Sequence, residues 1–294
     1  MSLSKDQIQE YGAKGVLRVR GALSFEDLQP VIEELEEIID RRARQLHAEG
    51  EIEELWENEP FEIRYGLLYR QSRSMGKGLD IMQYRGSATF SFLGNDRLLN
   101  VLQSLLGEEI TCNPIQHLRA KPPDQYEEHT GPSIHHAPWH QDAAVMMPEA
   151  EGSEVITCWL PLGEATAEMG CMEVIPDQVD GGYLPHQKEG GTTVVPALLP
   201  ETEPVIMACD KGDIVLMSRF TPHRSRPNVS KRCRWSLDLR YQPTGQHTGR
   251  TGHPDFVVRS ALHPDRVVDD HPAWCRMWEE ALENRSGVVM HRSV

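Results

Sequence analysis

The chain has 294 residues, with 39% hydrophobic and 26% charged side chains and a formal net charge of −15. This composition is typical of a folded protein, and the acidic field argues against nucleic acid as a partner because a polyanion is repelled. The sequence has no apolar run long enough to span a membrane, no secretory signal at its start and no C-x-x-C pair among its six cysteines. We therefore expect a protein of the reducing cytoplasm that contacts neither nucleic acid nor a membrane.

Two amphipathic helices are predicted in the first part of the chain. In residues 24–47 apolar residues recur at helical spacing, and Ser24 can cap the helix together with Asp27. Residues 96–106 repeat the pattern and end at Gly107. We interpret both helices as packing elements without a chemical role.

Short apolar segments dominate the chain after residue 108. Each is of strand length and is bounded by Gly, Pro or Asp, which predicts a sandwich or barrel. The segments cover residues 109–120, 154–162, 171–176, 192–199, 204–210, 212–218 and 233–243. A last helix is predicted over 271–285, and no linker interrupts the chain. We therefore expect one mainly β domain spanning 1–294, with a helical cover mainly over 1–107 and a core at about 108–245.

The triplet His140-Gln141-Asp142 raises the question of a metal site. Because residues i and i+2 of a strand share a face, His140 and Asp142 would project together. They would supply two of the three ligands of the 2-His-1-carboxylate triad of non-haem Fe(II) oxygenases. One such triplet among 13 histidines is also expected by chance. A distant third ligand is offered by His223, which follows the apolar strand predicted at 214–218.

A basic segment follows His223. Between residues 219 and 240 there are seven basic residues and one acid, Asp238, which indicates either a site for a small anion or a solvated strand face. Arg234, Ser236, Asp238 and Arg240 alternate with apolar residues, so one strand face is polar. Arg234 can hold a carboxylate through two hydrogen bonds, and Ser236 can add a third. Arg240 competes for that role, or forms an ion pair with Asp238 or with an acid of the helical layer.

These features together resemble the phytanoyl-CoA dioxygenase family of Fe(II)- and 2-oxoglutarate-dependent oxygenases. The matching segments are "AKPPD", "WHQD", "TCWLPLGEATAEMGCMEVIP" and "GDIVLMS" with the following histidine, and then an arginine eleven residues later. The resemblance implies a double-stranded β-helix, a cupin-like jelly roll, with supporting N-terminal and C-terminal helices. It also implies Fe(II), 2-oxoglutarate as cosubstrate and O2.

The resemblance assigns roles to individual residues. It makes His140, Asp142 and His223 the iron ligands at the catalytic centre, and Arg234 the partner of the 2-oxoglutarate C5 carboxylate. Trp159 and His117 match positions near the cosubstrate in the family. Ser225 matches a position that would assist Arg234. The chain departs from the family at 177–179, where Asp-Gln-Val replaces a frequent Gly-Ser-His, so the substrate wall there differs.

The expected reaction is hydroxylation of a C–H bond of a small molecule, with release of succinate and CO2. Desaturation, epimerisation and ring closure stay open, as do a cupin-like metal enzyme without 2-oxoglutarate and a jelly-roll binding protein. The substrate, an anion among the options, and the oligomeric state are not identified by the sequence. Residues 50–90 are expected to shape the substrate pocket. His135 and His136 are expected to be solvated, and the remaining histidines are interpreted as surface residues: His186, His247, His253, His263, His271 and His291.

Overall fold

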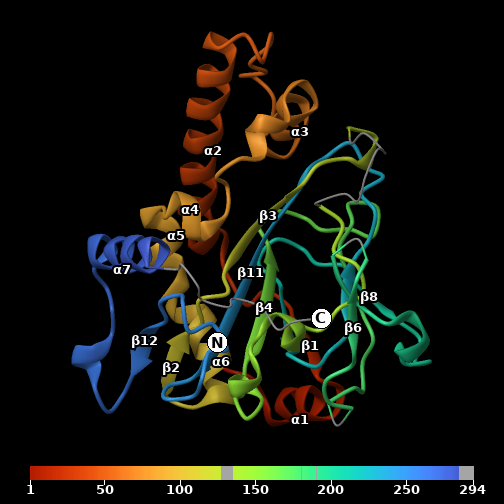
Figure 1. The fold of residues 1–294 in the computed structure, drawn as a ribbon, viewed down its shortest axis with the longest axis vertical. Coiled ribbons are helices and arrows are strands. Elements are labelled where there is room, and N and C mark those ends of the chain that lie inside the picture. The colour runs from red at the N-terminus through yellow and green to blue at the C-terminus, as the bar shows by residue number, and fades with distance from the viewer. Residues whose placement is uncertain (127–134, 180, 190, 285–294) are drawn as a thin grey trace.

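Two antiparallel β-sheets and a set of helices make up the protein in this computed structural model (Figure 1). The structure describes residues 1–126, 135–179, 181–189 and 191–284. None of the described helices is both long and apolar enough to cross a membrane.

The larger sheet is built around its longest strand, β11 (Arg234–Pro243). β11 pairs with β4 along one edge, while β3 and β2 share its other edge. In sheet order the strands are β1 (Val16–Val19), β9 (Ile214–Ser218), β4 (Ile156–Pro161), β11, β2 (Glu109–Cys112) and β12 (Phe256–Ser260), with β3 (His117–Lys121) beside β11.

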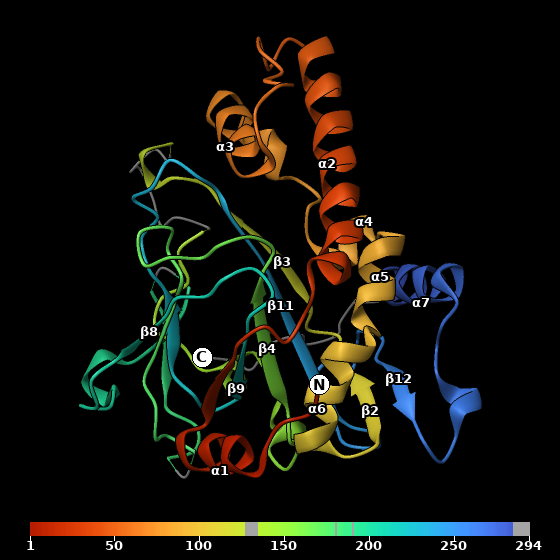
Figure 2. The same cartoon turned by 180° about the vertical axis from the view of Figure 1, so that it is seen from behind.

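A smaller sheet stands against one face of the larger one (Figures 1 and 2). Its strands run in the order β10 (His223–Ser225), β5 (Met172–Val174) and β8 (Val205–Met207), and a separate ribbon joins β6 (His186–Lys188) to β7 (Thr192–Val194). Trp159 and Val215 of the larger sheet pack with Met172 and Val174 of the smaller sheet in one buried cluster. Two such facing antiparallel sheets form the predicted jelly roll.

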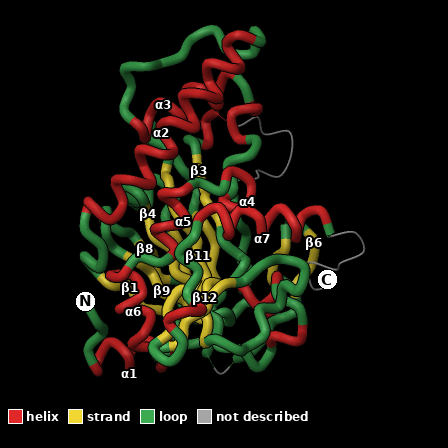
Figure 3. Tube along the Cα trace, turned by 90° about the vertical axis from the view of Figure 1, so that its left-hand side faces the viewer, coloured by secondary structure: helices red, strands yellow, loops and turns green. Residues whose placement is uncertain are grey.

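Helices cover the opposite face of the larger sheet. They are α2 (Phe25–Ala48), α3 (Phe61–Gln71), α4 (Ile81–Tyr84), α5 (Ser87–Leu93), α6 (Asp96–Leu106) and α7 (His271–Glu283). The remaining helix, α1 (Lys5–Lys14), lies at the lower end of the sheets in Figure 1, beside β1. Single 3-10 turns lie at η1 (Arg73–Gly76), η2 (Asp124–Tyr126), η3 (Asp142–Val145), η4 (Pro148–Ala150), η5 (Pro196–Leu198) and η6 (Pro264–Arg266). In the tube view α5 and α7 lie in front of the strands of the larger sheet (Figure 3).

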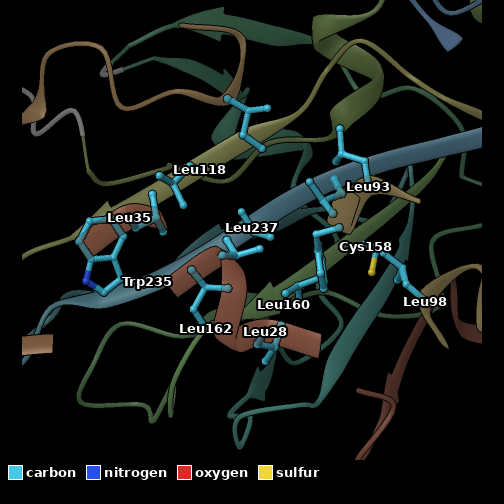
Figure 4. Packing of buried hydrophobic residues seen from close by; sticks show 14 of the residues in the cluster. Leu28, Leu35, Leu93, Leu98, Leu118, Cys158, Leu160, Leu162, Trp235 and Leu237 are labelled. Atoms are coloured by element: carbon cyan, nitrogen blue, oxygen red, sulfur yellow. The ribbon is translucent and has the colours of Figure 1, made fainter. Parts of the chain in front are cut away.

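The main core lies between this helical layer and the sheet. Leu28 and Leu35 of α2 reach the sheet beside Leu160 of β4 and Leu237 of β11 (Figure 4). Every second residue of β11 enters this core, since Trp235, Leu237, Leu239 and Tyr241 are all buried in it. The intervening side chains of β11 therefore face the smaller sheet, because side chains alternate along a strand.

Most predicted elements are confirmed at their expected places. The helices at 24–47 and 96–106 are α2 and α6, and the Ser24–Asp27 capping box is present. The last helix ends at Glu283, and residue 285 lies outside the described residues. The single-domain organisation stays a prediction.

Two predicted strands are wrong in part. Within 192–199 only β7 (Thr192–Val194) is a strand, and Pro196–Leu198 form the 3-10 turn η5. Residues 109–120 form two strands, because the chain turns at Asn113 and Pro114. The Asn113 side chain accepts a hydrogen bond from the Ile115 amide at 2.9 Å, and proline has no amide proton to give to a ladder. The short strands β1, β6, β10 and β12 were not predicted, and β6 and β10 span only three residues each.

Candidate metal centre and cosubstrate pocket

The structure brings His140, Asp142 and His223 together. One ligand atom from each of the three residues lies within 4.8 Å of the others. His223 begins β10, and His140 pairs with it through two backbone hydrogen bonds of 2.9 and 3.0 Å. This bridge brings together two segments that are far apart in the sequence, which explains how the third ligand reaches the triplet.

Both histidines present the same ring nitrogen to the centre. The Nδ1 of His140 lies 2.8 Å from the Pro138 carbonyl, and the Nδ1 of His223 lies 2.9 Å from the Thr221 carbonyl. A carbonyl oxygen can only accept, so each Nδ1 carries a proton, and Nε2 is the nitrogen that holds the lone pair in the neutral ring. This tautomer is the one that metal coordination through Nε2 requires.

Asp142 is buried and hydrogen-bonded through both of its oxygens. Thr157 of β4 donates to Oδ2, and Arg240 of β11 donates to Oδ1 over 2.7 Å. Although burial alone would raise the pKa of Asp142, the Arg240 guanidinium and His223 hold that pKa well below its usual range. The carboxylate is therefore ionised, as a metal ligand must be.

The pKa of His140 is lowered to about 4. Burial is the main cause, and the neighbouring His223, whose ring centroid is 4.2 Å away, adds to it. His140 is consequently neutral near pH 7, with its Nε2 lone pair free of a proton. Two imidazole nitrogens and one carboxylate oxygen on one side of a buried site are the donor set that suits Fe(II).

The local backbone differs from the expected strand. His140 makes a single bridge, and Asp142 begins the 3-10 turn η3. The convergence of the two side chains holds because Gln141 is extended, with φ −113° and ψ 142°. Gln141 points away, as predicted, and its amide donates to the carbonyls of Gly182 and Phe220.

A cavity of about 640 Å³ opens beside the three residues. Its wall includes Arg234, Asp238 and Arg240 from β11 and His117 from β3, together with residues 76–83 of the helical layer. The expectation that residues 50–90 shape this pocket therefore agrees with its lining.

Arg234 is a buried guanidinium, 3% exposed, that faces this cavity. Among the described residues its hydrogen-bond partner is the hydroxyl of Ser236, and no carboxylate pairs with it. Burial lowers the pKa of Arg234 to about 10, so the group remains charged near pH 7. A buried cation without an anion is costly, which indicates a site for a ligand carboxylate.

Arg240 forms structural ion pairs, which was one of the two roles that the sequence left open for it. Its guanidinium pairs with Asp142 over 2.7 Å and with Asp238 over 3.2 Å. Its terminal nitrogens are thus committed to protein acceptors, whereas those of Arg234 have one hydroxyl partner. The geometry favours Arg234 over Arg240 as the residue available to a cosubstrate.

Of the remaining predicted residues, Trp159, Ser225 and His117 line the cavity, and Ser236 is buried beside Arg234. Trp159 is buried with its ring 5.5 Å from the Arg234 guanidinium carbon, which fits either packing or cosubstrate contact. Ser236 is the hydroxyl partner of Arg234. Ser225 lies in β10 but bonds to the backbone of His135 and Ala137, so no bond links it to Arg234.

His117 pairs with an acid that sequence reasoning did not identify. Its Nδ1 lies 2.9 Å from the carboxylate of Asp80, which caps α4, and both residues line the cavity. Thr157 was missed in the same way, because its side chain reaches Asp142 only through the pairing of β4 with β11. No local motif marks either contact.

Two interpretations of other histidines are corrected. His186 is buried, because its ring accepts a hydrogen bond from the Gln141 amide and donates to the Leu184 carbonyl. His135 and His136 line the cavity and bond to Tyr69 and Asp124, so they are more than solvated loop residues. His291 lies outside the described residues.

Most of the basic segment is neutralised by acids from other elements. Arg224 and Arg226 pair with Glu173, and Arg232 pairs with Glu164. The segment is therefore not one anion site. Of its two buried arginines that line the cavity, Arg240 pairs with Asp142 and Asp238, whereas Arg234 has no carboxylate partner among the described residues.

The fold and this cluster define the class of non-haem iron oxygenases that depend on 2-oxoglutarate. The sequence profile of phytanoyl-CoA dioxygenase (PhyH) matches residues 11–236. The chain belongs to this family, and the His140, Asp142 and His223 cluster is a set of side chains that could hold the metal ion of such an oxygenase.

Solved structures share the fold at low sequence identity. The non-haem monooxygenase ThoJ has a TM-score of 0.66 at 17% identity and covers 96% of each chain. The epimerase SnoN, solved with Fe3+, α-ketoglutarate and nogalamycin RO, has a TM-score of 0.57 at 18% identity over 84% of this chain and 87% of its own. EvdO2 from Micromonospora carbonacea var. aurantiaca, solved with 2-oxoglutarate, has a TM-score of 0.55 at 19% identity over 82% of this chain and 91% of its own.

A curated relative matches over a shorter stretch. Methylphosphonate hydroxylase from Gimesia maris is 35% identical over 86 residues, which are 29% of this chain. The match spans 32% of the relative's own length.

Proposed function

We propose that the protein hydroxylates a C–H bond of a small anionic molecule. His140, Asp142 and His223 would hold Fe(II), and Arg234 would bind the C5 carboxylate of 2-oxoglutarate. When bound, iron and 2-oxoglutarate supply the oxidising chemistry, with O2 consumed and succinate and CO2 released. The protein's own part is to orient these groups and the substrate.

The observation that carries this proposal is a buried guanidinium beside the three metal-binding side chains. Arg234 shares the cavity with them and has no anionic partner among the described residues. A cupin-like enzyme without 2-oxoglutarate would give this charge no function. An intact metal set also argues against a binding protein that has lost its chemistry.

The proposed anionic substrate rests on the remaining charges of the cavity. Among its described acids, Asp80 pairs with His117, while Asp142 and Asp238 pair with Arg240. If 2-oxoglutarate takes Arg234, another cation remains on the wall. Arg119 has no hydrogen bond or ion pair with any described residue, and it lines the cavity.

The position of Arg119 fits a substrate contact. Arg119 lies opposite Ser236 in the pairing of β3 with β11, two pairs along from Arg234, which puts both on the same sheet face. Its charge contributes to lowering the pKa of Asp80, so it lies within electrostatic reach of the Asp80–His117 pair. A relative named for hydroxylating methylphosphonate, a small anion, supports the same class of substrate.

The reaction is tested by following O2 consumption and succinate release by the iron-loaded protein with 2-oxoglutarate. Methylphosphonate and short alkyl carboxylates serve as anionic probes, and the corresponding amides serve as neutral ones. We expect the anions to stimulate succinate release and to gain one oxygen atom by mass spectrometry. Stimulation by the neutral set alone would contradict the anionic assignment.

The role of Arg119 has its own variants. Arg119→Gln should raise the KM for the anionic probe by about 10-fold or more, since a hydrogen bond to a charged group contributes about 1.5–3 kcal/mol. Binding of 2-oxoglutarate should be unchanged, and Arg119→Lys should recover part of the loss. Arg276→Gln is the matched control, because Arg276 is exposed on α7 and outside the cavity lining. An equal rise in both variants would contradict the assignment.

A further inference from the structure

Arg240 bonds directly to a candidate metal ligand, Asp142. Its Nη2 donates to the Oδ1 of Asp142 over 2.7 Å. Both side chains are almost inaccessible, at 3% and 1% exposed. Thr157 donates to the other oxygen of the same carboxylate. Each oxygen of Asp142 is thus engaged before any metal arrives.

The guanidinium of Arg240 is itself held in place. Its Nη2 also donates to the Oδ2 of Asp238 over 3.2 Å. Its Nη1 donates to the carbonyls of Ile115 and Asp238 over 3.2 and 3.4 Å. The backbone amide of Arg240 is fixed by the side chain of Gln116, and β11 pairs with β4 on one side. A donor anchored at this many points fixes the plane of the carboxylate that it touches.

Two physical consequences follow for Asp142. The donors come from two neighbouring strands, β4 and β11, so the carboxylate cannot rotate without losing a hydrogen bond on one side. Its Oδ1 also shares electron density with a cation, which makes the carboxylate a weaker donor to a metal ion than a free carboxylate is. The pair therefore restrains both the direction and the strength of this ligand.

We propose that Arg240 is the positioning residue that presents Asp142 to iron through one oxygen and keeps the other coordination positions open for 2-oxoglutarate and O2. This inference rests on the proposed function. Arg240 acts through Asp142 and does not itself touch the cosubstrate. Its role differs from that of Arg234, which lies six residues earlier on the same strand face.

The test uses the weak visible charge-transfer band that 2-oxoglutarate gives when it chelates Fe(II). Without the Arg240 contact the carboxylate donates more strongly, iron becomes easier to oxidise, and the band should move to longer wavelength. We expect this shift in Arg240→Lys, which keeps the charge but loses the planar fork, and a larger shift in Arg240→Met. The affinity for 2-oxoglutarate should fall severalfold in both variants.

The removal of one buried charge can prevent folding, so a compensated variant is needed. Arg240→Met combined with Asp238→Asn removes a charge of each sign and should fold if the single variant does not. The matched control is Arg226→Met, which breaks a contact to Glu173 on the smaller sheet. We expect the control to keep the wild-type wavelength.

The outcomes separate this inference from the proposed function. A shifted or missing band in the folded Arg240 variants, with the control unchanged, supports the positioning role. A band at the wild-type wavelength in folded Arg240→Met/Asp238→Asn overturns it, as does an equal shift in the Arg226 control. Absence of the band in metal-loaded wild type overturns the proposed function instead.

Discussion

Each candidate ligand is fixed by contacts that no short motif records. His140 and His223 owe their ring orientation to the carbonyls two residues before them, Pro138 and Thr221. Because each contact is local, the same backbone that brings the two segments together also aims the rings. This preorganisation means that little rearrangement is needed to bind a metal ion.

Protonation of His140 should make the metal-free protein pH-sensitive. Its pKa falls from 6.5 to about 4 on folding, so between these values the unfolded chain binds more protons than the folded one. Stability is then full above about pH 6.5 and is lost as the pH falls towards 4. The expected loss is about 3 kcal/mol, since a tenfold change in protonation corresponds to about 1.4 kcal/mol.

Urea unfolding in the presence of a chelator, at pH values from 7.5 down to 4.5, measures this loss. The pKa of Asp142 is ordinarily acidic and is lowered further on folding. Protonation of Asp142 therefore destabilises the protein mostly below this pH range. His140→Asn keeps a polar side chain at the position but has no titrating ring, and it should show a flatter dependence. Equal slopes for the two proteins would argue against a buried neutral His140.

The two faces of strand β11 have different roles: one lines the cavity and the other packs in the core. Arg234, Asp238 and Arg240 line the cavity, while Trp235, Leu237, Leu239 and Tyr241 join the helical core. The alternation was predicted from the sequence because polar and apolar residues strictly alternate there. Stability and chemistry are therefore separable on the same strand.

Leu237→Ala tests this separation. Leu237 is fully buried against the helical layer, so its truncation should cost about 2–5 kcal/mol of unfolding free energy, as core leucines usually do. Metal affinity of the folded variant should stay within about twofold of wild type, because the side chain points away from the site. Val229→Ala, at a position 74% exposed, is the control and should cost under about 0.5 kcal/mol.

Metal affinity and the urea curve are measured on the same protein preparation. A large loss of metal affinity in folded Leu237→Ala would contradict the separation of the core face of β11 from its cavity face. A cost in Val229→Ala equal to that of Leu237→Ala would contradict it as well.

At the scale of the whole molecule, the jelly roll brings together residues whose proximity the sequence only suggests. Asp142 and His223 are far apart in the chain, and they meet because β10 pairs with the segment at His140. The sequence pointed to the three candidate ligands because H-x-D is local and His223 follows a clear apolar strand, and their role as ligands stays a prediction. The strand β10 itself escaped prediction, since three residues carry too little periodicity.

The partners of the ligands were beyond sequence reasoning for a related reason. Thr157 and Arg240 meet Asp142 through the register of β4 against β11, and one residue of slippage would turn both side chains away. Asp80 reaches His117 from the helical layer. Contacts of this kind depend on the packing of separate layers, so they become visible only in the folded structure.

The most direct test of the account is an anaerobic titration of the purified protein with Fe(II) and 2-oxoglutarate, followed in the visible spectrum. We predict a charge-transfer band in the wild type that is lost in His140→Ala, which lacks a ligand. In Arg234→Ala the band should be lost at 2-oxoglutarate concentrations that saturate the wild type, with iron still bound. Arg232→Ala, which removes an exposed arginine paired with Glu164, should keep the band. A wild-type protein that binds iron without the band, or an Arg234→Ala variant with an unchanged titration, would contradict the assignment of this site.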